Sequence, residues 1–335
     1  MNNLLNDKTV LSLINKDESY IIFNDGKAVR QNIVEDEIEI EIVDNYDTYE
    51  ICKHKRSDFE ECIVSNSRFT TVVNIYKSSD LKIIRFNDDE KYSNLVFNIA
   101  KGIDVNIVNV YFDVVTNTNA LVEVICGKKT NIKYTSIQSV KQDFKEYLNF
   151  YVDEKVNLDI NSLGLNENGV DNCTNVYLYK PLSTVNINNS IINNTGLTQR
   201  YDFNVYHWYQ DTTSNLINYA ICKDTSVLNI NSNGIIKKGC AKSKIHQKSK
   251  GIILDLKSAI SANPLLQIDE FDVEANHGAS IGAIDDEDLY YLMSRGLTKS
   301  QSEQLIVSGY MNPIINKIND ESIKNYIMHL IDQKL

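Results

Sequence analysis

The clearest candidate for chemistry in this sequence is a single histidine, His277, within the stretch EANHGASIGAIDDEDLYYLMSRGL. Asn276 and Gly278 flank it, and a segment that opens with four consecutive acids follows at Asp285–Asp288. A neutral imidazole is a common metal ligand, and iron is among the metals that it suits. The same side chain can also bond a backbone carbonyl at the end of a β structure. The residue types alone leave both interpretations open.

The six cysteines are the other candidates for chemistry, but they lie far apart, and no two have the CxxC spacing of a zinc or redox site. We therefore expect reduced thiols that pack mostly as small core residues. Cys222 and Cys240 could face the interior and hold sulfur, although a buried, unreactive thiol is the favoured interpretation. His207 and His246 have no evident partner and are expected to be structural.

The charge balance limits the classes of partner. A formal net charge of −11 argues against nucleic-acid binding, which needs clustered Lys and Arg to neutralise phosphates. The stretch KKGCAKSKIHQKSK, residues 237–250, is a local exception. We interpret it as a solvated edge, with an electrostatic dock for an acidic partner as the alternative. No signal peptide or membrane-spanning run is evident, so a cytoplasmic protein without a membrane partner is predicted.

From about residue 68 to residue 273, short segments alternate apolar and polar residues and are rich in Val, Ile, Tyr and Thr, which predicts a mainly β protein. An apolar-Asn-apolar phrase recurs around Asn106, Asn157, Asn186 and Asn229, as in repeat architectures. A stacked β-solenoid would explain the recurrence, with Asn at its corners. An antiparallel sandwich gives the same alternation. Hairpin signals occur only at residues 24–26 and 233–234, and the pattern leaves both folds open.

The two ends of the chain differ from this β region. Residues 1–67 are mixed, with a strand and turn expected over SYIIFNDG and a half-exposed strand over Glu37–Val43, whose carboxylates are expected to be solvated. After residue 284 the apolar period becomes 3.6. The predicted division is a mixed segment at 1–67, a β region at 68–283 and a helical domain at 284–335.

The helical domain carries recognisable caps. Asp285 or Asp286 can cap the first helix, Gly296 suits the position after it, and Thr298 opens the second helix with a capping box. Pro313 is expected to break or restart that second helix, and a last helix is expected over about residues 320–333. The first helix is also the favoured partner-binding surface. Residues 290–293 are four consecutive apolar or aromatic positions that span a full helical turn, so they cannot all face the β body, and some are expected to be free for a partner. The candidate residues are Leu289, Tyr290, Tyr291, Leu292, Arg295 and Gly296.

The run Asn276-His277-Gly278-Ala279-Ser280-Ile281-Gly282, followed by Ile284-Asp285, Leu289-Tyr290-Tyr291-Leu292 and Ser294-Arg295-Gly296-Leu297, resembles the C-terminal signature of the SufB/SufD family. These proteins are scaffold components of the SUF iron–sulfur cluster assembly system. The resemblance implies a right-handed parallel β-helix with a small C-terminal helical domain that docks the ABC-type ATPase SufC. It also implies that two scaffold subunits pair through their β-helices.

The details of the resemblance favour a SufD-type or generalised subunit. His277 matches the histidine of the SufD-type pattern, which is implied to lie where a nascent cluster is held. The SufB-type pattern has a glutamate where this chain has Gly278, and a cysteine in the preceding rung, where Ser261–Pro264 offers no thiol. SufD-type members often have a cysteine at the position of Ala275.

The resemblance therefore predicts a non-catalytic subunit with a SufC-type ATPase and either a SufB-type subunit or a second copy of itself as partners. No tightly bound cofactor is expected, although a transient iron–sulfur cluster, with His277 as its candidate ligand, is compatible with it. The absence of a GxxxxGK[ST] phosphate loop from the sequence agrees with a chain that does not itself hydrolyse ATP. The alternatives are a β-helix adaptor without a cluster role and a polysaccharide-acting β-helix enzyme, for which no convergent carboxylate pair is evident.

Overall fold

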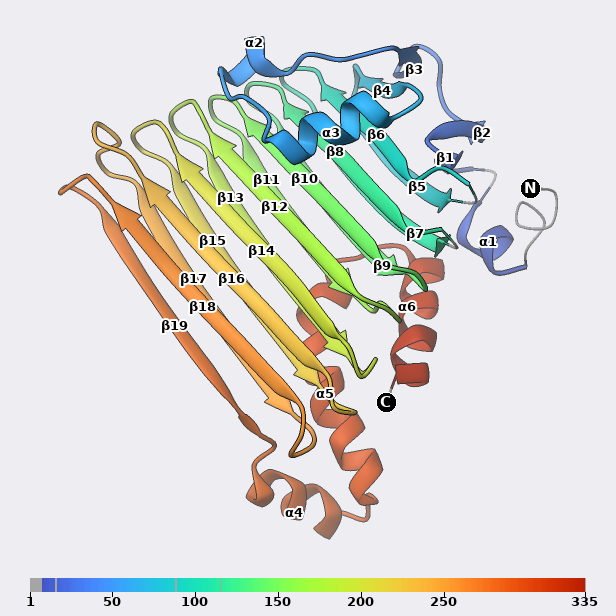
Figure 1. Cartoon of the computed structure of the whole chain (residues 1–335), viewed down its shortest axis with the longest axis vertical. Helices are drawn as coiled ribbons and strands as arrows, with labels where there is room; N and C mark the ends of the chain where they lie inside the picture. The colour runs from blue at the N-terminus through green and yellow to red at the C-terminus, as the bar shows by residue number, and fades with distance from the viewer. Residues whose placement is uncertain (1–7, 16, 88, 115, 335) are drawn as a thin grey trace.

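The computed structural model describes residues 8–15, 17–87, 89–114 and 116–334 and shows two long sheets that stack their strands side by side (Figure 1). Sheet A contains, in spatial order, β2 (Lys27–Asn32), β1 (Ser19–Asn24), β5 (Ser79–Asn87), β7 (Asp104–Val114), β9 (Asn131–Ser139), β11 (Asn157–Gly164), β13 (Thr184–Asn193), β15 (Thr213–Cys222), β17 (Lys244–Ile253) and β19 (Glu274–Ala283). Sheet B contains β3 (Ile38–Val43), β4 (Thr70–Ile75), β6 (Tyr92–Ile99), β8 (Thr118–Cys126), β10 (Phe144–Val152), β12 (Val170–Leu178), β14 (Thr198–His207), β16 (Val227–Ile236) and β18 (Ala259–Ile268).

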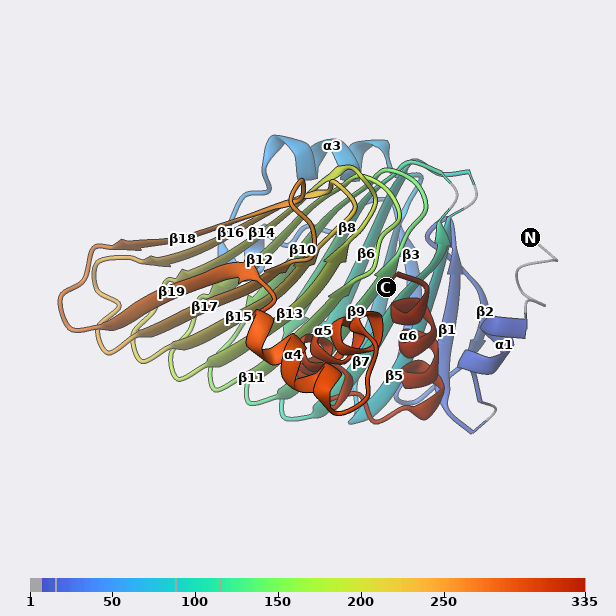
Figure 2. The same cartoon turned by 90° about the horizontal axis from the view of Figure 1, so that it is seen from below.

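From β4 to β19, successive strands alternate between the two sheets and every pairing is parallel. One strand of each sheet therefore makes one turn of a coil, or rung, and the rungs stack in register (Figure 2). This arrangement is a parallel β-helix, so the predicted mainly β fold is confirmed and the sandwich is excluded. The hairpin signal at residues 24–26 joins the antiparallel pair β1 and β2, whereas Gly234 lies inside β16. A Cβ at Gly234 would come within 2.9 Å of Ile245, so close packing explains that glycine.

Alternation within each strand builds the core between the two sheets. Inward side chains such as Tyr134 and Phe150 are fully buried, and their rings meet edge to face with centroids 5.3 Å apart. Such a contact contributes roughly 0.5–1.5 kcal/mol beyond the burial of the rings. The expectation that the recurrent asparagines occupy corners was wrong for three of the four: Asn106, Asn186 and Asn229 point outward from within their strands, whereas Asn157 is the first residue of β11. Their amides form ladders across the rungs, as in the 2.9 Å bond from Asn215 Nδ2 to Asn186 Oδ1.

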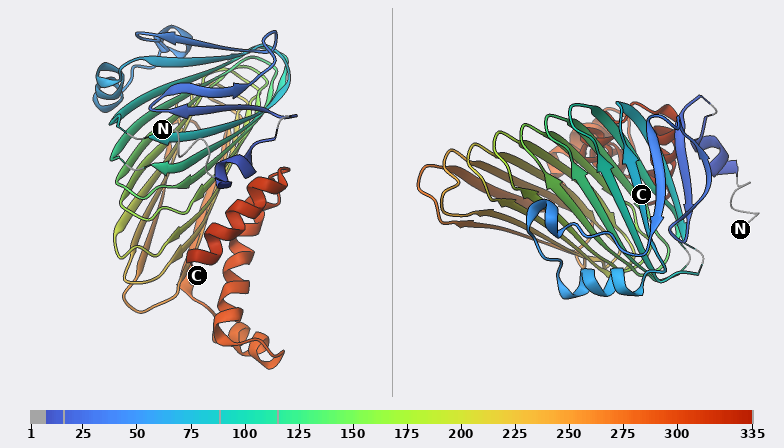
Figure 3. Two further views of the ribbon diagram at one scale, coloured as in Figure 1. Left: turned by 90° about the vertical axis from the view of Figure 1, so that its right-hand side faces the viewer. Right: turned by 90° about the horizontal axis from the view of Figure 1, so that it is seen from above.

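Helices cover the outer faces of the two sheets at different places (Figure 3). The helices are α1 (Lys8–Leu13), α2 (Tyr49–Cys52), α3 (Asp58–Asn66), α4 (Asp286–Ser294), α5 (Lys299–Ile315) and α6 (Glu321–Lys334). Helices α1, α5 and α6 bury the apolar part of the outer face of sheet A, with residues such as Met311 and Ile327 in that second core. Helix α3 lies over β6 and β8 of sheet B. None of the described helices is both long and apolar enough to cross a membrane.

The predicted helix caps are confirmed. Asp285 is the N-cap of α4, and Gly296 lies just after the end of that helix with φ +97°. Thr298 forms a capping box with Gln301 at the start of α5. The expectation for Pro313 was wrong, because this proline lies inside α5, two residues before its end at Ile315.

Lys82 ties both ends of the chain to the β-helix. Its side chain is 6% exposed, and its ammonium donates to Leu13 O at 2.5 Å and to Glu18 Oε2 at 2.9 Å. It also forms an ion pair with Asp320, just before α6. A buried ammonium is costly unless it is paired, and here all three of its donors have a partner. The segment before β1 and the segment before α6 thus meet at a single cation on β5.

Candidate functional site

The two ends of the β-helix are built differently. At the start, the antiparallel strands β2 and β3 form the outermost members of the two sheets, and Ala28, Ile33 and Ile40 pack against the core there. At the other end, β18 and β19 each have a single hydrogen-bonded neighbour. No described element packs over this last rung, so its inward-facing residues remain partly or fully exposed.

The register identifies the residues that form this open end. The inward positions of β16 and β17 continue onto the last rung as Ile260, Ala262, Pro264, Leu266 and Ile268 of β18 and Ala275, His277, Ala279 and Ile281 of β19. Most are apolar, and Ile281 is 36% exposed. Burying such a surface against a partner yields about 25 cal/mol for each Å² of apolar area. β18 and β19 are ten-residue edge strands, and the unpaired N–H and C=O groups along such an edge can pair with a strand of another chain. The open end therefore has the properties of a pairing surface.

His277 is one of the inward residues of this open end. Its register partner is Gln247, which is buried and faces inward, so the His277 side chain also projects toward the interior and is exposed only because no rung follows. None of the described hydrogen bonds involves the His277 ring. They therefore give no support for a purely structural role in which His277 bonds a backbone carbonyl. The imidazole is therefore exposed on the uncovered end of the β-helix.

The side chains available as metal ligands limit which metal ion or cluster a single chain can bind. Among the described residues, no three His, Cys, Asp or Glu side chains come together in an arrangement suited to a metal ion. Iron–sulfur clusters are mostly held by cysteine thiolates, and the last rung contributes none. His277 alone supplies one ligand. Any iron or cluster held here would need further ligands from a second subunit or from the cargo itself.

Cys222 and Cys240 have the surroundings of structural thiols. Cys222 and Cys240 are buried, and their thiols lie 3.1 Å from Ser226 O and 3.2 Å from His207 O. Burial raises the pKa of the Cys222 thiol to about 11 and also raises that of Cys240. A raised pKa keeps a thiol protonated and poorly nucleophilic at neutral pH. The side chain of Cys52 lies outside the described residues.

The two other histidines with sequence-based predictions differ from each other. His207 is fully buried, with Nδ1 2.7 Å from Thr212 Oγ1 and Nε2 2.9 Å from Ser214 Oγ, and burial lowers its pKa to about 3. It is a neutral structural residue. His246 points outward from β17, and its Nε2 lies 3.6 Å from Glu274 Oε1.

Helix α4 projects from the rest of the molecule past the C-terminal end of β19 (Figure 1). It has no buried residue and contacts mainly α5. Tyr290 and Tyr291 are 76% and 56% exposed, Leu289 and Leu292 are half-buried, and the Arg295 guanidinium lies 5.2 Å from the centre of the Tyr291 ring. Gly296 ends the helix in a left-handed conformation. The predicted partner-binding residues therefore share one exposed element, and their binding role stays a prediction.

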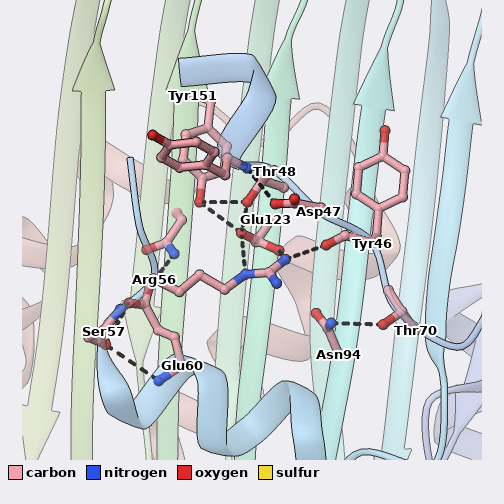
Figure 4. A network of polar contacts seen from close by, with 12 residues as sticks. Tyr46, Asp47, Thr48, Arg56, Ser57, Glu60, Thr70, Asn94, Glu123 and Tyr151 are labelled. Atoms are coloured by element: carbon pink, nitrogen blue, oxygen red, sulfur yellow. Dashed lines mark hydrogen bonds and ion pairs between the residues drawn. The ribbon is translucent and has the colours of Figure 1, made fainter. Parts of the chain in front are cut away.

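A buried ion pair that no sequence motif indicates fixes the segment before β4 to the outer face of sheet B (Figure 4). Arg56 Nη2 lies 2.5 Å from Glu123 Oε2, and the side chains are only 6% and 0% exposed. Thr48 and Tyr151 also donate to this carboxylate, at 2.9 and 2.7 Å. Arg56 additionally donates to Tyr46 O, so the network anchors the chain between β3 and α3.

The fold and site together define a β-helix with one open, partly apolar end and a protruding helical appendage beside it. Comparison with known protein families identifies the family: residues 84–310 match the model described as "SUF system FeS cluster assembly, SufBD core domain". The chain therefore belongs to the SufBD family of the SUF system.

Individual relatives point to the SufD branch. The iron-sulfur cluster assembly protein SufD of Bacillus subtilis (strain 168) is 25% identical over 314 residues, which cover 88% of this chain and 71% of the relative. The protein of the same name from Plasmodium falciparum (isolate 3D7) is 21% identical over 75% of this chain, and that of Escherichia coli (strain K12) is 30% identical over 26% of it. This chain spans only 18% and 21% of the latter two. It is a SufD-like member of the family, as the sequence signature predicted.

Proposed function

We propose that this chain is a non-catalytic scaffold subunit of iron–sulfur cluster assembly that pairs through its open end with a second SufB/SufD-type subunit. The observation that carries the proposal is the uncovered last rung, where β18 and β19 present unpaired edges together with inward apolar residues and His277. A SufB-type protein and a second copy of this chain are both candidate partners. The exposed imidazole would then lie at the junction, where a partner can add the ligands that one chain lacks.

The pairing surface predicts an effect of charge placed inside it. Ala279 faces inward on β19 and is exposed, so Ala279→Glu would bury an unpaired carboxylate only when a partner covers the rung. We expect pairing to weaken at least tenfold, because burying one uncompensated charge costs several kcal/mol. The measurement is light scattering after size exclusion of the chain alone and mixed with the SufB-type protein of the same genome.

The matched control for this experiment is Ala259→Glu, which introduces the same charge on the outer face of the same rung. Thermal unfolding of both variants checks that the monomer is intact. Equal pairing by wild type and Ala279→Glu would contradict the open end as the junction. A strictly monomeric wild type that also ignores the SufB-type protein would favour an adaptor without a scaffold partner.

We further propose that α4 docks a SufC-type ABC ATPase, which places the working complex in the cytoplasm, where ATP is available. Exposed tyrosine, arginine and methionine side chains are the types enriched at interface hot spots. Helix α4 exposes Tyr290, Tyr291 and Met293, and its C-cap Arg295 lies over the Tyr291 ring.

Removing the aromatic and cationic side chains of α4 should abolish this docking. For Tyr290→Ala, Tyr291→Ala and Arg295→Ala combined, we expect the affinity for the ATPase to fall at least about 100-fold, because each hot-spot truncation costs about 1–2 kcal/mol or more. The control combines Tyr76→Ala and Tyr209→Ala, which remove tyrosines that are 47% and 44% exposed elsewhere. Size exclusion with light scattering and a titration of the ATPase measure the effect. Undiminished binding by the α4 variant would place the dock on another surface.

A further inference from the structure

The basic stretch at residues 237–250 is resolved by the structure into two separate groups. Lys237, Lys238 and Lys242 lie in the turn between β16 and β17. The rest lie on β17, where strand alternation directs Ile245, Gln247, Ser249 and Gly251 into the interior. Four successive outward positions of β17 are therefore all basic: Lys244, His246, Lys248 and Lys250. We call these four residues the β17 stripe.

Only the first two residues of the β17 stripe have an acidic partner. Glu274 on β19 approaches Lys244 Nζ at 3.2 Å and His246 Nε2 at 3.6 Å. No ion pair among the described residues joins Lys248 or Lys250 to a carboxylate. A chain with a net charge of −11 thus keeps two uncompensated ammonium groups side by side on one strand. The composition of this acidic chain does not explain why lysine occupies both position 248 and position 250.

Space beside these lysines has been left open. The outward neighbours on β19 are Gly278, Ser280 and Gly282, and a Cβ at either glycine would meet no atom within 4 Å. Across β17, the neighbouring strand β15 offers the half-buried apolar Ile217. A groove of about 640 Å³ runs across β15, β17 and β19 here. Its lining includes the outward residues Ile217, Lys248 and Ser280, and also His277 and Ala279 of the open end.

We propose that this groove binds an extended acidic segment of a partner protein, whose alternate carboxylates meet Lys248 and Lys250. Residues two apart along a strand are roughly 6.6 Å apart, which equals the spacing of alternate side chains in an extended peptide. The β17 stripe extends roughly 20 Å, far longer than a single phosphate or carboxylate. The bare outer face of β19 leaves room for a peptide backbone, and Ile217 offers an apolar contact for a side chain between two acids. The groove borders the open end, because His277 and Ala279 also line it, whereas Lys248 and Lys250 face outward from β17 and are not part of the pairing surface proposed above.

The test measures fluorescence anisotropy of a labelled peptide that alternates glutamate and threonine, titrated with the full chain at low ionic strength. Saturable binding is expected, weakening as salt is added. Lys248→Gln combined with Lys250→Gln should weaken it about tenfold, because each exposed ion pair contributes a modest amount and two are lost. Lys237→Gln combined with Lys238→Gln changes the net charge equally in the adjacent turn and should weaken binding less than about threefold.

Three results would overturn the proposal. The first is an absence of peptide binding at low salt. The second is an equal loss in both double variants, which would indicate a diffuse electrostatic field. The third is competition by inorganic phosphate at the peptide's own concentration, which would indicate a small-anion site. A peptide of the same composition with its glutamates in one block should bind more weakly, because only alternate acids match the stripe. Unchanged thermal unfolding of both variants shows that the exposed substitutions leave the fold intact.

Discussion

Replacing Arg56 by alanine should lower the free energy of unfolding by about 3 kcal/mol or more. The change leaves the Glu123 carboxylate, which is 0% exposed, without its positive partner. Thr48 and Tyr151 still donate hydrogen bonds to it, but neutral hydroxyls offset only part of the cost of a buried charge. Denaturant unfolding followed by circular dichroism measures the loss. Hydrogen exchange should show the earliest loss of protection in α3, which the network holds against sheet B.

Arg200 provides the matched control. It forms a comparable fork to Asp202, with Nη2 2.7 Å from Oδ2, but its side chain is 55% exposed. Exposed pairs contribute about 0–1 kcal/mol, so Arg200→Ala should cost less than about 1 kcal/mol. Arg56→Met combined with Glu123→Leu removes both charges and should recover part of the stability lost in Arg56→Ala. A loss in Arg56→Ala no greater than that in Arg200→Ala would mean that burial adds nothing to this pair.

His207 should make the protein sensitive to acid. Burial lowers its pKa from 6.5 to about 3, so below pH 6.5 the unfolded chain takes up a proton that the folded chain refuses. The stability associated with neutral His207 is therefore fully present above pH 6.5 and declines as the pH falls toward 3. Each pH unit in that window costs about 1.4 kcal/mol, so the loss at pH 4.5 is about 3 kcal/mol.

Comparison of two pH profiles isolates this effect from the titration of the carboxylates. His207→Gln removes the ionisable group and should flatten the profile between pH 7.5 and 4.5 by about 3 kcal/mol, whatever its stability at neutral pH. His329→Gln is the control, because His329 is exposed on α6. Unfolding midpoints in denaturant across the pH series give the profiles. If wild type and His207→Gln run parallel, His207 is not the acid-sensitive group.

Local signals in the sequence were sufficient for the elements but not for their assembly. Alternation predicted the strands, and the caps at Asp285 and Thr298 predicted two helix starts, because both depend on residues within a few positions. The choice between β-helix and sandwich depends on which strands pair, and alternation is the same in both. The family signature supplied that choice. Asparagine was assigned to corners because its turn preference is local, whereas the amide ladders join residues 26 to 32 positions apart.

The candidate site was predicted unevenly for the same reason. His277 and the α4 residues lie within one continuous signature and were identified from it. The open end combines β18 with β19, and its inward residues are known only once the register is fixed. The Arg56–Glu123 pair spans 67 positions, and nothing near either residue indicates the other. The division of the lysines between turn and strand also required the exact bounds of β17.

The uneven spacing of the rungs has a consequence for where this chain tolerates added sequence. In-register neighbours lie 26 residues apart at Glu146 and Asn172 but 32 apart at Asn231 and Asn263. Three of the six extra residues lengthen the turn at residues 237–243, and the other three lengthen the two strands of the rung. One residue inserted within a strand would send its outward side chains inward and break both core and ladder. A purification tag, a fluorophore or a whole inserted domain therefore belongs in a turn such as residues 237–243, and length variation among natural relatives should concentrate there.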